Sequence, residues 1–399
     1  MNLDQRKLDA IDKKRSNSFN WKGQFTPEFI EYLLDIYSKP NNVIADPFSG
    51  SGTVLSEAIR KNLSCIGYEV NPSAYYMSKF YEYAKCTSKE REDIANVITI
   101  KVNSALKKIP ANQLLYIDGG NYRECYQNLL KFVTTITEKT DEYYLPFILN
   151  VLFLSEKDKK MSIEASIKKS MAYVSGLLMD LPYTQCNIIA KLGDARNMGV
   201  EHKNEVDLII TSPPYINVFN YHQNYRGIIE CLGFNVLKVA ESEIGSNRKH
   251  RSNRFKTVVQ YAIDMGHTIY NTSFALKKGG KMVFIVGRVS TVRKTPFYNS
   301  EIIRDIVSAI PSLEIESWSE RQFGNRYGEC IKEDIICISK NSLDRIIDLS
   351  VFEQIGMKHI EAALQYAPNE MKEGLLSILN KKESIFESPI YNKLLTSPK

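Results

Sequence analysis

One stretch decides the fold of this chain: Asn42-Val43-Ile44-Ala45-Asp46-Pro47-Phe48-Ser49-Gly50-Ser51-Gly52-Thr53. Its apolar start predicts a short strand that ends at Asp46, and the residues from Val54 to Arg60 predict a helix. The loop between them holds two glycines, which let the backbone pass close to a ligand, and the helix start offers N–H groups. This order indicates a nucleotide-binding α/β fold, although a purely structural turn from strand to helix would share the pattern.

A second strand is predicted at Ser64-Cys65-Ile66-Gly67-Tyr68-Glu69, and it ends in an acid. Glu69 follows Asp46 by 23 residues. Nucleotide-binding α/β folds place the carboxylate that holds the ribose hydroxyls about 20 residues beyond the glycine loop. The position of this acid therefore favours a bound nucleoside over a structural turn.

A third strand, buried on both faces, is predicted from the largely apolar run Val206-Asp207-Leu208-Ile209-Ile210. It leads into Ser212-Pro213-Pro214-Tyr215, where two prolines end the strand because neither can donate a hydrogen bond to a sheet. Such a turn leaves backbone carbonyls without ladder partners beside one hydroxyl and one aromatic ring. These groups suit a flat ring that carries an amine. A plain Pro-Pro turn after a core strand is the alternative interpretation.

Taken together, the two stretches carry a resemblance to a known family. Asp-Pro-Phe-Ser-Gly-Ser-Gly-Thr at 46–53 resembles the cofactor motif of S-adenosylmethionine-dependent DNA amino-methyltransferases. Thr-Ser-Pro-Pro-Tyr at 211–215 resembles their catalytic motif, in the form most associated with N4-cytosine methylation, which some N6-adenine enzymes share. Three further segments, at 22–27, 193–196 and 279–286, are similar to family segments, and the resemblance covers about half of the chain.

The resemblance implies roles for particular residues. Catalytic roles fall on Ser212, Pro213, Pro214 and Tyr215. Contact with S-adenosylmethionine falls on a larger set from the cofactor segments: Phe25, Thr26, Pro27, Asp46, Pro47, Phe48, Ser49, Gly50, Gly52, Thr53, Glu69, Asp194 and Ala195.

The residue types of the catalytic motif suit chemistry at an exocyclic amine. The lone pair of such an amine is delocalised into its ring, so the amine is a poor nucleophile. Hydrogen bonds from the amine to the Ser212 hydroxyl and the Pro213 carbonyl would favour the sp³ nitrogen of the transition state. Tyr215 would stack on the target base, which must flip out of the duplex at a cost of about a few kcal/mol. No cysteine lies in the motif, and this argues against methylation at C5.

The expected architecture is α/β, a Rossmann-like and mostly parallel seven-stranded methyltransferase sheet with a terminal β-hairpin and a large helical insertion. The methyltransferase domain is expected at 1–73 and 189–345, the helical insertion at 74–188 and a helical C-terminal extension at 346–399. Helical periodicity in the insertion is clearest at 91–106, 122–137 and 163–178. The hairpin is expected from strands near 313–319 and 333–339.

The region that recognises DNA is either the insertion at 74–188 or the segment after the catalytic motif, about 216–270. Within the second segment, residues 246–256 hold five Lys and Arg and no acid, which suits phosphate contacts. The candidates in this run are Arg248, Lys249, Arg251 and Arg254, and a solvated loop is the alternative interpretation. Near the hairpin, Arg321, Asn325 and Arg326 are further candidates for contact with DNA.

Composition sets wider bounds on the function. The 399 residues are 43% hydrophobic and 25% charged, with a net charge of +6, which permits a polyanionic partner. No signal-like leader and no stretch near 18 apolar residues is found, so secretion and membrane spanning are not expected. Seven dispersed cysteines favour reduced thiols in the cytoplasm. Five dispersed histidines have no metal-binding spacing, so no metal site is expected.

The function expected from these features is DNA N4-cytosine methylation with S-adenosylmethionine as cofactor. Double-stranded DNA is the expected substrate, and the biological role is that of the modification enzyme beside a cognate restriction endonuclease. Adenine N6 is the close alternative. RNA or a protein glutamine amide is a more distant one, because relatives with those substrates usually carry Asn at the position of Ser212. A non-catalytic DNA-specificity subunit is the alternative from another class.

Overall fold

The computed structural model describes residues 3–108, 122–158, 161–216, 221–246, 250, 252–324, 328–380 and 385–390. Among these described residues, one sheet of seven strands has the order β3-β2-β1-β4-β5-β9-β8. Strands β1 to β5 are parallel to one another, whereas β9 pairs antiparallel with both β5 and β8. The strands are β1 Val43–Asp46, β2 Ser64–Glu69, β3 Ile188–Leu192, β4 Val206–Thr211, β5 Leu276–Gly287, β8 Leu313–Gly324 and β9 Cys330–Lys340.

The predicted fold class is confirmed by this sheet. Strands β1 and β2 have the bounds expected from the sequence, and β8 and β9 form the expected antiparallel hairpin at the edge of the sheet. A second small hairpin, formed by β6 Val289–Val292 and β7 Thr295–Tyr298, was not expected. It follows β5 directly and turns at Arg293 and Lys294, both of which have positive φ.

The central strands β1 and β4 are buried on both faces, and their successive residues belong to two different cores. On β1, Ile44 belongs to one core and Ala45 to the other; on β4, Leu208 and Ile209 divide in the same way. A side-chain period of two explains this division, and burial on both faces explains why these two strands are largely apolar. The strand ends are therefore the places on this sheet where polar groups can meet a ligand.

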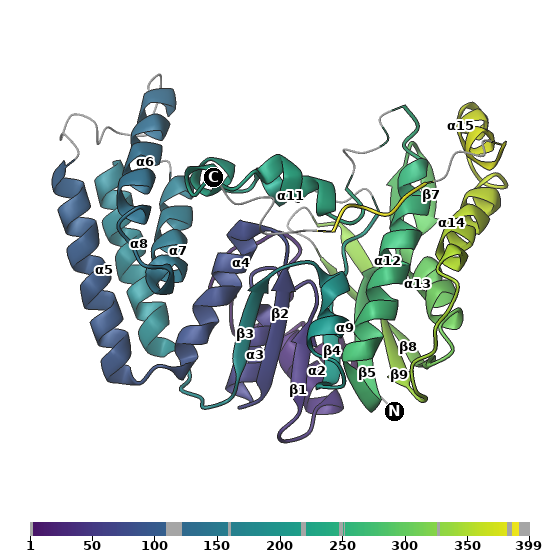
Figure 1. Cartoon of the computed structure of the whole chain (residues 1–399), viewed down its shortest axis with the longest axis horizontal. Coiled ribbons are helices and arrows are strands. Elements are labelled where there is room, and N and C mark those ends of the chain that lie inside the picture. The colour runs from purple at the N-terminus through teal and green to yellow at the C-terminus, as the bar shows by residue number, and fades with distance from the viewer. Residues whose placement is uncertain are drawn as a thin grey trace.

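Helices cover both faces and both ends of the sheet (Figure 1). Helices of the core with α2 and α3 pack on one face, and those of the core with α9, α12, α13 and α14 pack on the other. The helices before β3 are α1 Gln5–Leu8, α2 Pro27–Tyr37, α3 Thr53–Arg60, α4 Pro72–Lys79, α5 Ser88–Lys108, α6 Tyr122–Thr137, α7 Leu145–Lys157 and α8 Ile163–Asp180. Those after β3 are α9 Met198–Glu201, α10 Arg226–Cys231, α11 Val236–Ser242, α12 Lys256–Ala275, α13 Asn299–Ser308, α14 Ser350–Ala363 and α15 Asn369–Asn380.

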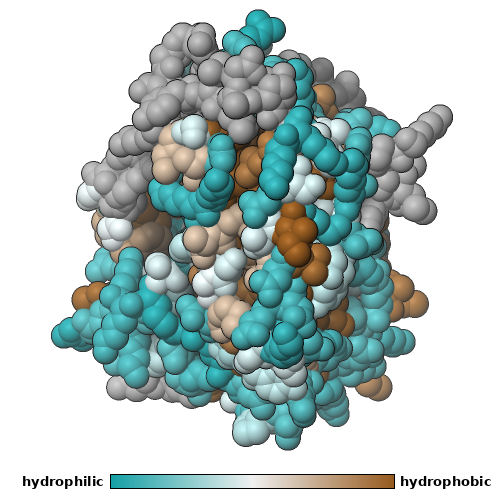
Figure 2. Space-filling view, turned by 90° about the vertical axis from the view of Figure 1, so that its left-hand side faces the viewer, coloured by the Kyte–Doolittle hydropathy of each residue, from teal (hydrophilic) through white to brown (hydrophobic). Residues whose placement is uncertain are grey.

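Helices α5 to α8 gather beyond β3, at one end of the sheet (Figure 1). Three of them were predicted from periodicity, and α7 was not. Residues 146–153 of α7 are all buried, so this helix carries no polar stripe that would mark a helical period. Figure 2 shows the outer face at this end, where hydrophilic side chains surround hydrophobic ones at separate places. Of the described helices, none is long and apolar enough to cross a membrane.

Helix α12 is part of the core. Most of its side chains are buried against the sheet and α14. Residues 256–270, the last part of the segment at 216–270, therefore belong to this buried helix.

The C-terminal extension is only partly helical. It holds α14 and α15, but residues 385–390 form no helix, contrary to the expectation. These residues cross α12, where the Asp264 carboxylate accepts hydrogen bonds from the Ser388 N–H and hydroxyl (Figure 1). Hydrogen bonds to the carboxylate of Asp264 on α12 fix this segment, so its polar groups do not depend on a helix of their own.

Candidate active site

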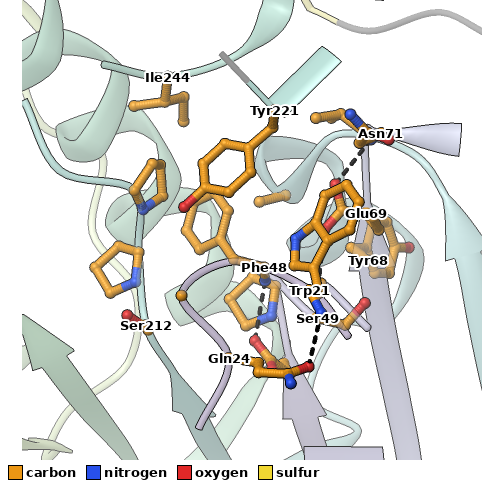
Figure 3. Close-up of a pocket in the computed structure, with 18 of the residues that line it drawn as sticks. Trp21, Gln24, Phe48, Ser49, Tyr68, Glu69, Asn71, Ser212, Tyr221 and Ile244 are labelled. Atoms are coloured by element: carbon orange, nitrogen blue, oxygen red, sulfur yellow. Dashed lines mark hydrogen bonds between the residues drawn. The ribbon is translucent and has the colours of Figure 1, made fainter. Parts of the chain in front are cut away.

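The pocket lies at the carboxyl ends of β1 and β4. The chain leaves β1 toward β2 and β3 on one side, and β4 pairs with β1 on the other. In open α/β sheets, ligands bind in the crevice at such a change of direction. Figure 3 shows the pocket, with Ser212 on one side of the opening and Trp21 and Glu69 on the other.

Asp46, at the end of β1, is buried and bonded to the end of β4. Its Oδ1 accepts a hydrogen bond of 2.6 Å from the Thr211 hydroxyl and one of 3.0 Å from the Phe48 N–H. Burial raises the pKa of Asp46 to about 7, against the effect of these two bonds. Both bonds fall on Oδ1, so the second carboxylate oxygen is left to face the pocket.

Glu69, at the end of β2, fastens the glycine loop. Its Oε2 accepts from the Gly50 N–H at 2.9 Å, and its Oε1 accepts from the Asn71 N–H at 2.8 Å. Burial raises the pKa of Glu69 to about 7, against the two backbone hydrogen bonds and with a smaller contribution from the carboxylates Glu243 and Asp46. Each carboxylate oxygen has two lone pairs, so Glu69 can hold the loop and still accept hydrogen bonds from ribose hydroxyls.

The loop between β1 and α3 needs its glycines. Gly50 and Gly52 have φ of 51° and 88°, the left-handed region that other residues rarely adopt. A Cβ on Gly52 would lie 2.9 Å from the ring of Tyr81 behind the loop. Beside them, the Ser49 hydroxyl oxygen is buried and has no hydrogen-bond partner among the described residues. Ser49 lines the pocket, so the loop holds a buried hydroxyl without a partner at the pocket wall.

Two aromatic rings cover the loop. The rings of Trp21 and Tyr221 are stacked, with centroids 5.9 Å apart and an angle of 17° between their planes (Figure 3). Trp21 is buried against Gly50. The backbone N–H of Trp21 donates to Oε1 of Gln24, which also accepts from the Ser51 hydroxyl. The segment before α2 is thus fixed over the pocket by the same loop that it covers.

The turn Ser212-Pro213-Pro214-Tyr215, called the lip from here on, is held in place by residues of β5 and β9. The ring of Tyr215 lies against Gly287, where a Cβ would come within 2.6 Å of it. Its hydroxyl donates to Oε1 of Glu333 at 3.0 Å and lies 3.3 Å from the Ser212 hydroxyl. Burial, followed by the charge of Glu333, raises the pKa of Tyr215 well above its ordinary value. Tyr215 is therefore a neutral hydrogen-bond donor with a fixed ring.

A buried arginine lies behind the residues expected near the cofactor adenine. The guanidinium of Arg196 donates to both carboxylate oxygens of Asp194, at 2.8 and 2.6 Å. It also donates to the backbone carbonyl oxygens of Ser388 and Pro389. The C-terminal segment at 385–390 therefore helps to fix the position of Asp194.

Glu243 also lines the pocket, and His222 lies behind it. Nδ1 of His222 and Oε2 of Glu243 are 3.0 Å apart, and both side chains are buried. Glu243 Oε1 has no hydrogen-bond partner among the described residues. Since this carboxylate raises the pKa of Glu69, the pocket holds several acidic groups close together. Such a pocket favours a cationic ligand.

The structure brings most of the predicted site residues to one pocket. All four catalytic candidates line it. Of the cofactor candidates, those that line it are Phe25, Asp46, Pro47, Phe48, Ser49, Gly50, Thr53, Glu69, Asp194 and Ala195. Thr26 and Pro27 begin helix α2, and Gly52 lies behind the loop, so these three support the pocket from outside its lining.

The structure describes only some of the candidates for DNA binding. Arg248, Lys249 and Arg251 lie outside the described residues, as do Asn325 and Arg326. Arg254 is partly buried just before α12. Arg321, named as a further candidate, is 6% exposed and donates to Glu333. Cross-strand pairing in the hairpin directs this side chain inward, and its contact with DNA stays a prediction.

Several lining residues were not expected from the sequence. They include Trp21, Tyr68, Glu243 and Glu333. Trp21 precedes the recognised segment at 22–27, so its position was a signal that could have been used. Glu243 and Glu333 belong to no motif, and only the folding of distant strands and loops brings them to the pocket.

Comparison with known proteins agrees with this geometry. Residues 6–80 match the family model for N6 and N4 methyltransferases, described as DNA methylase. Over 52 residues the chain is 36% identical to the Type II methyltransferase M.MjaII of Methanocaldococcus jannaschii; the match covers 13% of this chain and 10% of that protein. The chain is thus similar to DNA methyltransferases in the part that holds the glycine loop and Glu69.

Two solved structures are remote matches. A SAM-dependent methyltransferase from Methanosarcina mazei is 10% identical, with 78% of this chain and 98% of that chain covered and a TM-score of 0.35. An rRNA methylase from Streptococcus thermophilus is 7% identical, with 80% and 98% covered and a TM-score of 0.31.

The pocket fits S-adenosylmethionine, the cofactor of the matched family. The buried Ser49 oxygen without a partner and the loop fastened to Glu69 suit the polar edge of a nucleoside. The acidic groups Asp46, Glu69 and Glu243 suit the positive charge of a sulfonium and an ammonium group. Family match and pocket agree on S-adenosylmethionine as the cofactor.

Proposed function

We propose that this protein is a site-specific DNA methyltransferase that methylates the exocyclic N4 of a flipped cytosine. One observation carries the proposal: the hydrogen bond from Thr211 to Asp46 holds the glycine loop and the Ser-Pro-Pro-Tyr lip at the same pocket. The donor of the methyl group and its acceptor therefore meet between the ends of β1 and β4. An isolated glycine loop or an isolated lip would not support this function.

The cofactor end of the pocket would be formed by the loop and the segment before α2. Glu69 would accept hydrogen bonds from ribose hydroxyls, and Phe25, Phe48 and Trp21 would cover the ligand's apolar parts. Asp46 would face the positive charge near the methionine end. Bound S-adenosylmethionine supplies a methyl group that is electrophilic because it is attached to a sulfonium.

The lip would hold the target amine. Its N–H groups would donate to the Ser212 hydroxyl oxygen and the Pro213 carbonyl oxygen, and these bonds strengthen as the nitrogen becomes tetrahedral. Tyr215 would stack on the base and orient it toward the methyl group. As the new N–C bond forms, the S–C bond of the sulfonium would break and leave a neutral thioether, and the amine would release one proton to solvent.

The choice of cytosine rests on the form of the motif. Ser at position 212 is most associated with N4-cytosine methylation, and adenine N6 is the alternative because some adenine enzymes share Ser-Pro-Pro-Tyr. A non-catalytic DNA-specificity subunit would need neither the buried loop nor the lip, and both are intact here.

Double-stranded DNA is the proposed substrate, and a cognate restriction endonuclease in the cytoplasm is the proposed functional partner. Arg248, Lys249, Arg251 and Arg254 would neutralise phosphates of the DNA. The helical segment at 74–188 is the second candidate for recognition of the target sequence. A gene for a nuclease next to the gene for this protein would support the restriction–modification role.

The decisive experiment is product analysis. The protein is incubated with varied double-stranded DNAs and radiolabelled S-adenosylmethionine, and the digested nucleosides are identified by mass spectrometry. We expect N4-methylcytosine. N6-methyladenine would replace the cytosine assignment with the adenine alternative, and no labelled nucleoside in any DNA would contradict the enzymatic function.

A variant separates binding from transfer. Tyr215→Ala is expected to abolish methylation and to leave the cofactor affinity near the wild-type value, because the ring contacts the base rather than the loop. Isothermal titration calorimetry and the transfer assay measure the two properties. Loss of both together would mean that Tyr215 supports the fold of the pocket instead.

A further inference from the structure

The lip is joined to the terminal hairpin through one carboxylate. Tyr215 donates its hydroxyl hydrogen to Oε1 of Glu333, which lies on β9 and is 118 residues away in the sequence. Glu333 lines the same pocket as Ser212 and Tyr215. The lip therefore depends on a residue that belongs to none of the recognised motifs.

Glu333 is itself fixed by a second hairpin residue. Arg321 lies opposite it on β8, and the guanidinium donates twice to Oε2, at 2.8 Å from Nε and 2.6 Å from the terminal nitrogen. Both side chains are buried, with 6% and 7% exposure. Because Arg321 occupies Oε2, the other oxygen of Glu333 is left for Tyr215.

Arg321 is in turn packed among aromatic rings from the start of the chain. Its guanidinium carbon lies 3.8 Å from the ring centroid of Phe29 and 5.8 Å from that of Phe25. Cations over aromatic faces at these distances are attracted by the ring. Phe25 lines the pocket, so one chain of contacts runs from the segment over the cofactor, through the hairpin, to the lip.

We propose that Glu333, held by Arg321, is a positioning residue that fixes the ring of Tyr215 for the target base. Gly287 supports the face of the ring, and the bond to Glu333 fixes its hydroxyl end, so both ends of the side chain are set before the base arrives. Pre-set geometry of this kind increases the rate of transfer without changing how tightly the cofactor is held. This inference rests on the proposed methyltransferase function.

A buried ion pair could also serve only to hold the hairpin together. In that case its loss would lower stability and act on all properties of the site alike. A positioning role predicts a different result: the rate of methyl transfer falls, the cofactor affinity is kept, and the effect is transmitted through the Tyr215 hydroxyl.

The test is a double-mutant cycle of Tyr215→Phe and Glu333→Gln in the full chain. It measures the single-turnover methylation rate at saturating DNA, the dissociation constant of S-adenosylmethionine and the melting temperature. We expect Tyr215→Phe, which keeps the ring and the ion pair, to slow transfer by about tenfold or more with unchanged cofactor affinity. The double variant should be no slower than the slower single variant.

Asp334→Asn is the matched control. Asp334 is the next residue on β9, is buried, and accepts hydrogen bonds from Arg288 and Ser300 instead of a pocket residue. We expect it to lower the melting temperature and to leave the single-turnover rate unchanged. An equal loss of rate in Asp334→Asn would contradict a specific role for Glu333.

The outcomes separate the two proposals. If the wild-type protein transfers no methyl group to any DNA, the proposed function fails. If the wild type is active and Tyr215→Phe transfers at the wild-type rate, or the two substitutions act additively, the positioning role fails. Tyr215→Phe alone decides the matter should Glu333→Gln not fold.

Discussion

The Thr211 hydroxyl donates to Oδ1 of Asp46 at 2.6 Å, across 165 residues of sequence. This bond joins the end of β4 to the end of β1, and both partners are buried. It also lowers the pKa of Asp46, although burial still leaves that pKa at about 7. The bond therefore controls the charge that the pocket presents to its ligand.

Thr211→Val tests this control. The substitution keeps the shape of the side chain and removes the donor, at a cost of roughly 1–3 kcal/mol for the acceptor left without it. We expect a further rise in the pKa of Asp46 and a weaker affinity for S-adenosylmethionine by calorimetry at pH 7. Thr211→Ser keeps a hydroxyl and should bind nearly as well as the wild type. Equal affinity in Thr211→Val would exclude the bond as a determinant of cofactor binding.

The raised pKa values of Asp46 and Glu69, each about 7, predict that the stability of the free protein depends on pH. Between the ordinary carboxyl pKa near 4 and the folded value near 7, the folded state binds more protons than the unfolded state. The free energy of unfolding should therefore fall as pH rises through this window, by up to about 1.4 kcal/mol per pH unit for each group. Above pH 7 this contribution should level off.

Cofactor affinity should follow the opposite trend. Ionised Asp46 and Glu69 attract the positive charges of S-adenosylmethionine, so binding should tighten between pH 6 and pH 8. Chemical unfolding and calorimetry on the wild type and on Asp46→Asn/Glu69→Gln measure both trends. The double variant should lose the fall in stability over this window, and an unchanged pH profile would refute the assignment to these two groups.

Gly287→Ala should impair catalysis from a distance. A Cβ at this position would lie 2.6 Å from the Tyr215 ring, so the ring must leave its position on β5. We expect a large loss of the methylation rate while the cofactor affinity is retained. Gly176→Ala is the matched control: it lies in α8, a Cβ there meets no atom within 4 Å, and the change should stabilise the helix by about 1 kcal/mol. Normal activity in Gly287→Ala would show that the ring position does not matter.

Trp21 offers a direct reporter of cofactor binding. The sequence has two tryptophans, and Trp318→Phe leaves Trp21 as the single indole next to Gly50 and Tyr221. We expect S-adenosylmethionine to change the Trp21 fluorescence in a saturable way, since ligand would replace solvent on the exposed edge of the ring. Trp21→Ala in the wild-type chain should weaken binding measured by calorimetry. An unaltered emission at saturating cofactor would place the ligand away from this ring.

The sequence predicted the parts of this site whose chemistry is local. The strand ending at Asp46, the glycine loop and the Pro-Pro turn each carry their signal within a few residues, because strand burial, positive φ and missing N–H groups constrain residue type directly. The hairpin of β8 and β9 was predicted for the same reason. The place of Glu69 at the pocket could be predicted because the distance from strand to strand is regular in this kind of fold, and its contact with ribose stays a prediction.

The remaining parts depend on contacts between distant segments. Glu333 and Arg321 look like ordinary residues of an edge hairpin, and only the pairing of β9 with β5 brings them beneath the lip. Helix α7 was not predicted because its buried residues lack a polar face. The C-terminal segment at 385–390 was expected to be helical, and its conformation is set by Asp264 and Arg196 on other elements.

The central position of β1 in the sheet has a consequence for how the chain folds during synthesis. β1 is made first, yet one of its edges stays open until β4 pairs with it, with Ile44 beside Leu208. Pairing over such a sequence distance is slow, and open strand edges promote association with other chains. N-terminal fragments that end before β4 should therefore aggregate when expressed, and shielding of nascent β1 by a chaperone should increase the yield of soluble protein.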